Sequence, residues 1–167
     1  MTVDGTDFRI IQLAPFSKKW YSHKFNGPGL RYEVGLCIKT GDIVWIHGPF
    51  PPGDWPDISI FRHALIHNLA EGERVEADAG YVGEFPRFVK TPVPYESPEV
   101  IRMRKATLAR HETVNKRFKQ WGCLKQVFRH SHDLAYKHAS VFRAVAVITQ
   151  LAIEDGEPLY AVKYDDY

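Results

Sequence analysis

Two apolar runs joined by a glycine-containing turn constrain the fold of this chain more than any other feature. The runs cover 31–39 and 43–47, and the turn between them is Thr40-Gly41-Asp42. Because glycine readily adopts the positive φ that a tight turn requires, the pattern predicts a β-hairpin. The fold therefore contains an antiparallel pair of strands, and an all-helical bundle is excluded.

The other predicted strands are short and lie on both sides of this hairpin in the sequence. Residues 2–13 are rich in β-branched and apolar side chains and predict a strand. Two more short strands are predicted over 74–78 and 85–90. Proline and glycine interrupt 14–29 and 48–57, so both segments are predicted to be irregular.

Helical patterns dominate the second half of the chain. Asp57 is suited to cap a first helix, whose apolar residues recur at helical spacing: Ile58, Phe61, Leu65 and Leu69. A long helix is predicted over 99–128, with an apolar face formed by Val114, Phe118, Trp121 and Leu124. Gly122 is expected to kink or end this helix. A last helix over 139–153 is apolar nearly all round, which predicts that it is buried.

This order of elements predicts an α/β fold, a mixed sheet covered by helices. The 167 residues are interpreted as one domain, 1–167, because neither a repeat nor a linker divides them. No stretch approaches the ~18 apolar residues that a membrane span needs. The N-terminus lacks the basic and apolar regions of a secretory signal. Cys37 and Cys123 are predicted to be reduced, packed thiols in a reducing compartment.

Positive charge is concentrated in one part of the chain. Residues 101–130 contain nine Lys and Arg residues and a single acid, Glu112, so this segment carries +8. Because the whole chain carries only +2, the remaining residues carry −6. A basic helix on an acidic body favours a polyanionic partner such as DNA, although a solvated helix face gives the same pattern. The candidate phosphate contacts are Arg104, Lys105, Arg110, Lys116, Arg117 and Lys119.

Three acidic residues occupy positions typical of a metal-dependent active site. Asp4 lies inside the first predicted strand, Asp78 ends a later strand, and Glu112 is carried by the basic helix. Clustered carboxylates need a cation to offset their repulsion, and hard oxygen ligands select Mg²⁺ or Mn²⁺. Two such ions can stabilise the attacking and leaving oxygens at a phosphodiester. If the three carboxylates act together, they should converge on one crevice, roughly 4–8 Å apart.

The same acids also fit a simpler interpretation. They can be a turn aspartate, a strand-end aspartate and a helical glutamate paired with arginine. Asp57 has two readings as well, a helix cap or an accessory acid near the metals.

Several motifs occur in a characteristic order along nearly the whole chain: 3–6, 20–34, 48–62, 76–81 and 110–115. Their order, and the 33 residues between Asp78 and Glu112, resemble the DDE superfamily endonucleases, the transposase domains related to PIF/Harbinger elements. An alternative register would put the third acid at Phe118, which is not acidic, so the spacing favours Glu112.

The resemblance implies an RNase H-like fold, with the first acid on the first strand, the second after the fourth and the third on a late helix. It implies two divalent ions, Mg²⁺ or Mn²⁺, held by Asp4, Asp78 and Glu112, with Asp57 as the accessory ligand. The implied activity is hydrolysis of DNA by water to leave a 3′-hydroxyl, which can then attack target DNA.

Relatives of this type carry a helix-turn-helix region upstream of the first acid, whereas here only three residues precede Asp4. We therefore expect an N-terminally truncated domain that lacks part of a central strand, and a separate DNA-binding partner protein. A nuclear location is expected if the host is eukaryotic and a cytoplasmic one otherwise, without secretion.

Two other functions remain open at this point. A catalytically inactive transposase remnant would act as a nucleic-acid- or protein-binding module. An RNase H-like nuclease acting on RNA would use the same phosphate chemistry.

Overall fold

The predicted hairpin forms and supplies two strands of the sheet. The computed structural model describes residues 1–12 and 14–162. Strand β3 (Gly27–Leu36) pairs antiparallel with β4 (Ile43–Phe50), and Gly41 in the connecting turn has a φ of +86°. The hairpin prediction is therefore confirmed, together with the conformational role of its glycine.

The sheet is mixed, and β1 (Thr2–Arg9) lies at its centre. All eight residues of β1 pair with β3 in antiparallel register. On its other side, β1 runs parallel to β5 (Val75–Glu76), which in turn runs parallel to β6 (Val89–Lys90). A short strand, β2 (Tyr21–Ser22), pairs with the start of β3.

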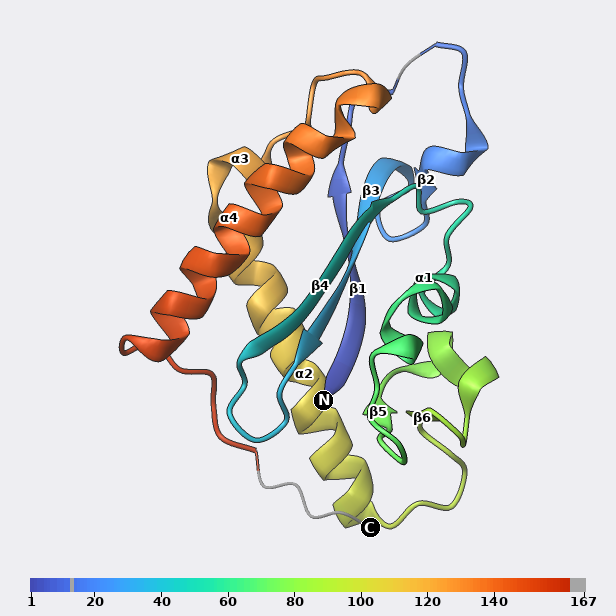
Figure 1. Ribbon diagram of the computed structural model, residues 1–167, viewed down its shortest axis with the longest axis vertical. Coiled ribbons are helices and arrows are strands. Elements are labelled where there is room, and N and C mark those ends of the chain that lie inside the picture. The colour runs from blue at the N-terminus through green and yellow to red at the C-terminus, as the bar shows by residue number, and fades with distance from the viewer. Residues whose placement is uncertain (13, 163–167) are drawn as a thin grey trace.

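Helices cover both faces of this sheet, as Figure 1 shows. One face packs against α2 (Pro98–Gln120), the short α3 (Gly122–Lys125) and α4 (Ala135–Glu154). The other packs against α1 (Asp57–His63) and the 3-10 turns η2 (Leu65–His67) and η3 (Ala79–Glu84). The remaining 3-10 turns are η1 (Lys18–Trp20) and η4 (His132–Leu134). The structure is thus an α/β fold with an open mixed sheet and flanking helices, as predicted.

Side chains alternate strictly between the two faces of the central strands, and this alternation determines where the charged residues lie. The α2 face buries Phe8 of β1, Tyr32 of β3, Phe118 of α2 and Phe142 of α4 in one core. The α1 face has a second core around Val3, Phe61 and Tyr81, which also includes Leu65, Val75, Ala77 and Val89. Successive residues of β1 therefore face different cores.

The strand and helix boundaries differ from the prediction in four places. β1 ends at Arg9, and β3 already begins at Gly27, inside the segment predicted to be a loop. β4 continues through Pro49, which is tolerated because β4 pairs on one side only, with β3, so the missing N–H costs no ladder bond. The first helix is shorter and ends as a 3-10 turn. The long helix breaks at Trp121, next to Gly122, where a kink or an end was expected.

Two burial predictions are wrong. Trp121 is 41% exposed, whereas Val114, Phe118 and Leu124 are buried as expected. Helix α4 is not buried all round, because one side of it is exposed to solvent. Both errors have the same cause: an apolar residue is buried only where another element covers it.

Cys37 and Cys123 are both free thiols, as predicted. Cys37 is half-buried, whereas Cys123 is exposed, so the prediction that both are packed is wrong for Cys123. Within the described ranges, none of the helices has the length and apolar character needed to cross a bilayer.

Candidate active site

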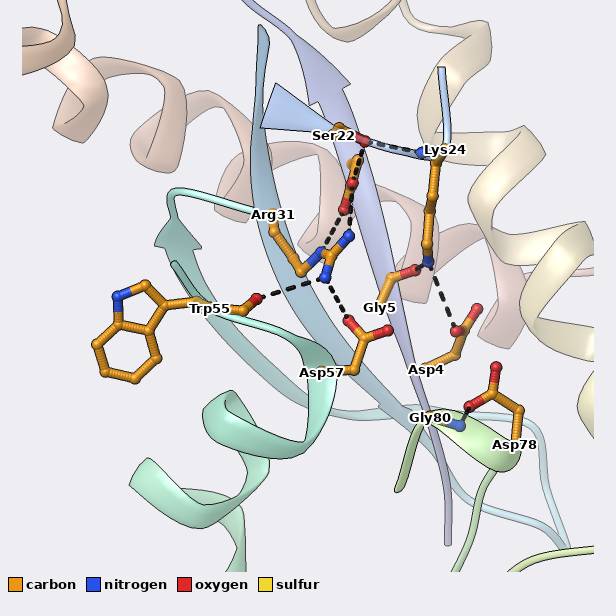
Figure 2. Close-up of polar contacts among 10 residues, drawn as sticks. Asp4, Gly5, Ser22, Lys24, Arg31, Trp55, Asp57, Asp78 and Gly80 are labelled. Atoms are coloured by element: carbon orange, nitrogen blue, oxygen red, sulfur yellow. Dashed lines mark hydrogen bonds and ion pairs between the residues drawn. The ribbon is translucent and has the colours of Figure 1, made fainter. Parts of the chain in front are cut away.

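Asp4 lies on β1, Asp78 lies just after the neighbouring strand β5, and both face the same side of the sheet. The parallel pairing of β1 with β5 aligns Thr2 with Glu76. Asp4 and Asp78 each lie two residues further along the chain than their member of that pair. Glu76 pairs with Arg104 of α2 at 2.9 Å, which identifies this side as the one that α2 covers. The Gly80 amide donates a hydrogen bond to Asp78 Oδ1 at 2.8 Å and orients that carboxylate (Figure 2).

Glu112 reaches the same site from α2. Its side chain lines a pocket of about 290 Å³ together with Asp4, Asp78 and Lys105. The preceding residue anchors the helix, because buried His111 Nε2 lies 2.7 Å from the Thr2 hydroxyl on β1. The structure therefore places the three predicted acids along one pocket. The spacing of roughly 4–8 Å expected between their carboxylates stays a prediction.

Burial and like charge make Asp4 the most perturbed acid of this pocket. The pKa of Asp4 is raised to about 6, mainly by burial. Lys24 opposes this shift, and the carboxylates of Asp57 and Asp78 add to it. The Lys24 ammonium lies 3.9 Å from Asp4 Oδ1 and donates a hydrogen bond to the Gly5 carbonyl. Lys24 is thus the cation that offsets part of the carboxylate repulsion.

The donor set of the pocket suits a hard divalent cation, since it consists of carboxylate oxygens. Within the described residues, no three Asp, Glu, His or Cys side chains already form a group that could hold an ion. The three acids therefore line one pocket, but they do not form a ready-made set of metal ligands.

Asp57 lies on the opposite face of β1 from Asp4. Its Oδ1 atom pairs with Arg31 Nη1 at 3.3 Å, and it forms no capping hydrogen bond because it is the first residue of α1 and not its cap. Burial is the main cause that raises the pKa of Asp57, and Arg31 lowers it. This placement makes Asp57 part of a buried ion-pair network and contradicts the capping interpretation. Its carboxylate still raises the pKa of Asp4, so the accessory role of Asp57 near the metals stays a prediction.

Arg31 is the centre of that network. It forms two parallel hydrogen bonds with Asp7, from Nε at 2.8 Å and from Nη2 at 2.9 Å, as well as the contact with Asp57. Its Nη1 also donates to the Trp55 carbonyl at 3.3 Å. Ser22 donates to Asp7 Oδ2 at 2.5 Å, so a strand, a hairpin and the start of α1 are joined beneath the pocket (Figure 2).

Gly5 makes this arrangement possible through its missing side chain. A Cβ atom at this position would lie 2.1 Å from Asp57 Oδ1, well inside van der Waals contact. The glycine that follows the first acid therefore has a structural reason: it lets the Asp57 carboxylate approach the backbone of the central strand.

Glu33 is a further carboxyl group buried on the α1 face. It has no exposed surface and accepts a hydrogen bond from Trp45 Nε1 at 2.9 Å. Burial raises the pKa of Glu33 to about 7, from an ordinary value of 4.5.

The buried Glu33 predicts a specific pH dependence of stability. Between about pH 4.5 and 7, the unfolded chain loses the proton of Glu33 while the folded protein keeps it. The contribution of Glu33 to the free energy of unfolding is therefore present below that range and is lost as the pH rises through it. Glu33→Gln, which keeps an acceptor for Trp45, should therefore gain stability relative to the parent from about pH 5 to about 7.5. Urea denaturation of both proteins measures the difference.

Buried histidines change the stability with pH in the opposite direction. The test is therefore the difference in free energy of unfolding between Glu33→Gln and the parent, and not the pH dependence of either protein alone. Burial lowers the pKa of His138 to about 4 and that of His111 to about 3, and their neutral forms stabilise the protein as the pH rises. Glu71→Gln, at an exposed position, serves as the control. A free-energy difference between Glu33→Gln and the parent that is constant with pH would contradict the assignment.

The basic residues of α2 divide into two groups. Arg104 is buried and pairs with Glu76 and Glu96, and Arg110 is buried and donates to the Ile38 carbonyl at 2.8 Å. The prediction that these two guanidinium groups face a phosphate backbone therefore conflicts with their position in the core.

Of the other four basic residues, two are engaged and two are free to meet a ligand. Arg117 donates to the Glu157 carbonyl at 2.6 Å, and the Lys119 ammonium lies 5.6 Å from the centre of the Phe8 ring. Lys105 and Lys116 are exposed. They lie seven residues before and four residues after Glu112, which places all three on one face of α2.

The network around Arg31 and the role of Lys24 were not predicted from the sequence. The signal was present, because Arg31 and Glu33 alternate with apolar residues along a hairpin strand. Such alternation is typical of a strand with one solvated face, whereas here α1 covers that face.

Comparisons with protein-family models, with curated proteins and with solved structures found no match to this chain.

Proposed function

We propose that this protein is a metal-dependent endonuclease of the DDE transposase type, which hydrolyses phosphodiester bonds in DNA. The observation that carries the proposal is that Asp4, Asp78 and Glu112 line one pocket although they come from two strands and a helix. Carboxylates repel one another, so three acids without a shared role are not expected to line the same pocket.

The topology supports an RNase H-like assignment of the fold. Asp4 lies on the first strand, and Asp78 follows β5, the fourth strand when β2, which pairs only with the start of β3, is set aside. Glu112 lies on the long helix that follows the sheet. These are the positions that the resemblance to DDE enzymes implies for the three acids.

Two divalent ions, Mg²⁺ or Mn²⁺, fit the chemistry of these ligands. Asp4 and Asp78 would hold them from the sheet, and Glu112 would complete the site from α2. When bound, such ions stabilise the charge on the attacking and leaving oxygens of the phosphodiester.

The protein's own residues would hold the substrate and balance the charge of the pocket. Lys24, whose ammonium lies 3.9 Å from Asp4 Oδ1, offsets part of the charge of that carboxylate. Lys105 and Lys116 flank Glu112 on the exposed face of α2 and would contact phosphates on both sides of the cleaved bond.

The direct test is a nicking assay on supercoiled plasmid DNA. We expect nicks with Mg²⁺ or Mn²⁺, none with EDTA, and products whose 3′-hydroxyl ends a polymerase can extend. A parallel assay with duplex RNA separates DNA cleavage from RNA cleavage. Intact plasmid under all metal conditions would contradict the proposal.

A catalytically silent nucleic-acid-binding module is the second candidate. The contact between Lys24 and Asp4 favours it, because an internal cation already compensates the first acid. This function predicts binding of DNA in EDTA at the same affinity as in Mg²⁺, without nicks. If it holds, the protein would act with a separate DNA-binding partner, in the nucleus of a eukaryotic host.

The exposed lysines of α2 predict the salt dependence of DNA binding. Each phosphate contact contributes about −0.9 to the slope of log K against log salt on duplex DNA. Lys105→Glu combined with Lys116→Glu should weaken binding to all sequences and make the slope shallower by about one to two units. Fluorescence anisotropy in a salt series measures both quantities.

Lys125→Glu is the matched control, because Lys125 is exposed in the same basic segment but lies on α3. It should change the slope by less than the double variant does. If the double variant and the parent have the same slope, the DNA does not contact this face of α2.

A further inference from the structure

One face of α4 is apolar and exposed, although the opposite face of the helix packs in the core. Phe142 and Val145 are buried, whereas Val147 is 59% and Leu151 is 55% exposed. Figure 1 shows α4 on the outside of the molecule, on the far side of the sheet from α1. In the described structure, no element covers this exposed face.

The exposed face follows a regular pattern along the helix. Its residues recur at alternating spacings of three and four, and all are exposed: Lys137, Ser140, Ala144, Val147, Leu151 and Glu154. We call these six residues the α4 seam. Alternation of three and four is the pattern with which one helix packs along another, and the length of α4, 20 residues, gives about 30 Å of contact.

The α4 seam is complementary to itself when two copies run antiparallel. A twofold axis at its midpoint, between Ala144 and Val147, brings Ala144 of each copy opposite Val147 of the other. The same axis brings Ser140 opposite Leu151, so each large side chain meets a small one. At the two ends it brings Lys137 opposite Glu154, so opposite charges meet twice in one dimer.

A parallel arrangement lacks this complementarity. It would align Lys137 with Lys137 and Glu154 with Glu154, and it would place the small residues opposite each other and leave a gap. Charge and size both select the antiparallel orientation.

The surroundings of the seam extend the surface. A groove of about 250 Å³ lies between α4 and the edge strand β4, and its lining includes Val44, Val147 and Leu151. Val44 is itself 50% exposed. An apolar ridge with a groove beside it is the shape that a second copy of the same ridge can fill.

We infer that two copies of this chain associate through an antiparallel, twofold-symmetric contact between their α4 seams. The occupant of the exposed face is thus a second copy of the protein. Because one helix pair is smaller than a standard interface, the dimer should be weak, with dissociation in the micromolar range. The inference does not depend on the proposed nuclease activity.

Sedimentation equilibrium over a concentration series tests the contact. The parent protein should shift from one chain, 19.2 kDa, to twice that mass as the concentration rises. Val147→Asp should weaken association at least about tenfold, because it buries two carboxylates at the centre of the seam. Val82→Asp is the matched control, since Val82 is 60% exposed on η3, on the other face of the sheet, and it should associate like the parent.

A charge exchange then tests the orientation. Lys137→Glu and Glu154→Lys should each weaken association about tenfold, because each places like charges at both ends of the contact. The double variant restores opposite charges and should associate within about threefold of the parent. A parent protein that stays monomeric at every concentration would overturn the inference. So would a dimer that is indifferent to Val147→Asp, or a charge-exchanged double variant no stronger than the single ones.

Discussion

Asp78→Asn should abolish metal-dependent nicking of plasmid DNA while the protein remains folded. We expect a loss of about a thousandfold or more, which corresponds to about 4 kcal/mol of transition-state stabilisation. The physical reason is that asparagine keeps the size of the side chain and its acceptor for the Gly80 amide but removes the charge that would hold a divalent ion. The initial rate of relaxation of supercoiled plasmid measures the loss.

Metal binding gives a second readout that does not depend on activity. Mn²⁺ should raise the melting temperature of the parent protein, because only the folded chain gathers Asp4, Asp78 and Glu112 into one pocket. Asp78→Asn should lose most of this shift. Asp133→Asn, at an exposed position in η4, is the matched control and should retain both the shift and the nicking rate.

These two measurements separate the candidate functions. A parent melting temperature that is indifferent to Mn²⁺ excludes a metal site in the pocket and favours the silent binding module. Nicking by Asp78→Asn at the parent rate would instead show that the cleavage arises elsewhere on the protein or in a contaminant.

The parts of the fold that follow from local chemistry were predictable from the sequence. The hairpin was predicted because one glycine and the apolar runs around it determine a turn without reference to the rest of the chain. The limits of β4 could not be predicted in this way. Whether a strand can continue through a proline depends on whether a neighbouring strand needs the missing N–H. The exposed face of α4 was missed for a similar reason, because composition shows how apolar a helix is but not what covers it.

The candidate site also has a part that could be predicted from the sequence and a part that could not. The convergence of Asp4 and Asp78 could be inferred, because a strand-borne acid and a strand-end acid meet when the two strands are neighbours. A count of charges could not separate exposed Lys105 from buried Arg104, since both stand in the same basic segment. Only the packing of α2 on the sheet shows that the Arg104 guanidinium neutralises Glu76 in the interior.

The buried network beneath the pocket gives the largest expected effect on stability. Arg31→Met removes the guanidinium that pairs with both Asp7 and Asp57 and leaves the two carboxylates without this partner on the α1 face. Breaking a buried ion pair in this way costs about 3–5 kcal/mol. Urea denaturation at neutral pH should therefore show a free energy of unfolding lower by that amount.

A second substitution separates the loss of the cation from the loss of packing. Adding Asp7→Asn to Arg31→Met removes one of the stranded charges, so the double variant should recover part of the lost stability. Arg62→Met, which breaks the exposed contact between Arg62 and Glu84, is the matched control and should cost less than about 1 kcal/mol. If Arg31→Met costs no more than Arg62→Met, the charges of Asp7 and Asp57 are solvated, and the pocket above them does not rest on a buried ionic base.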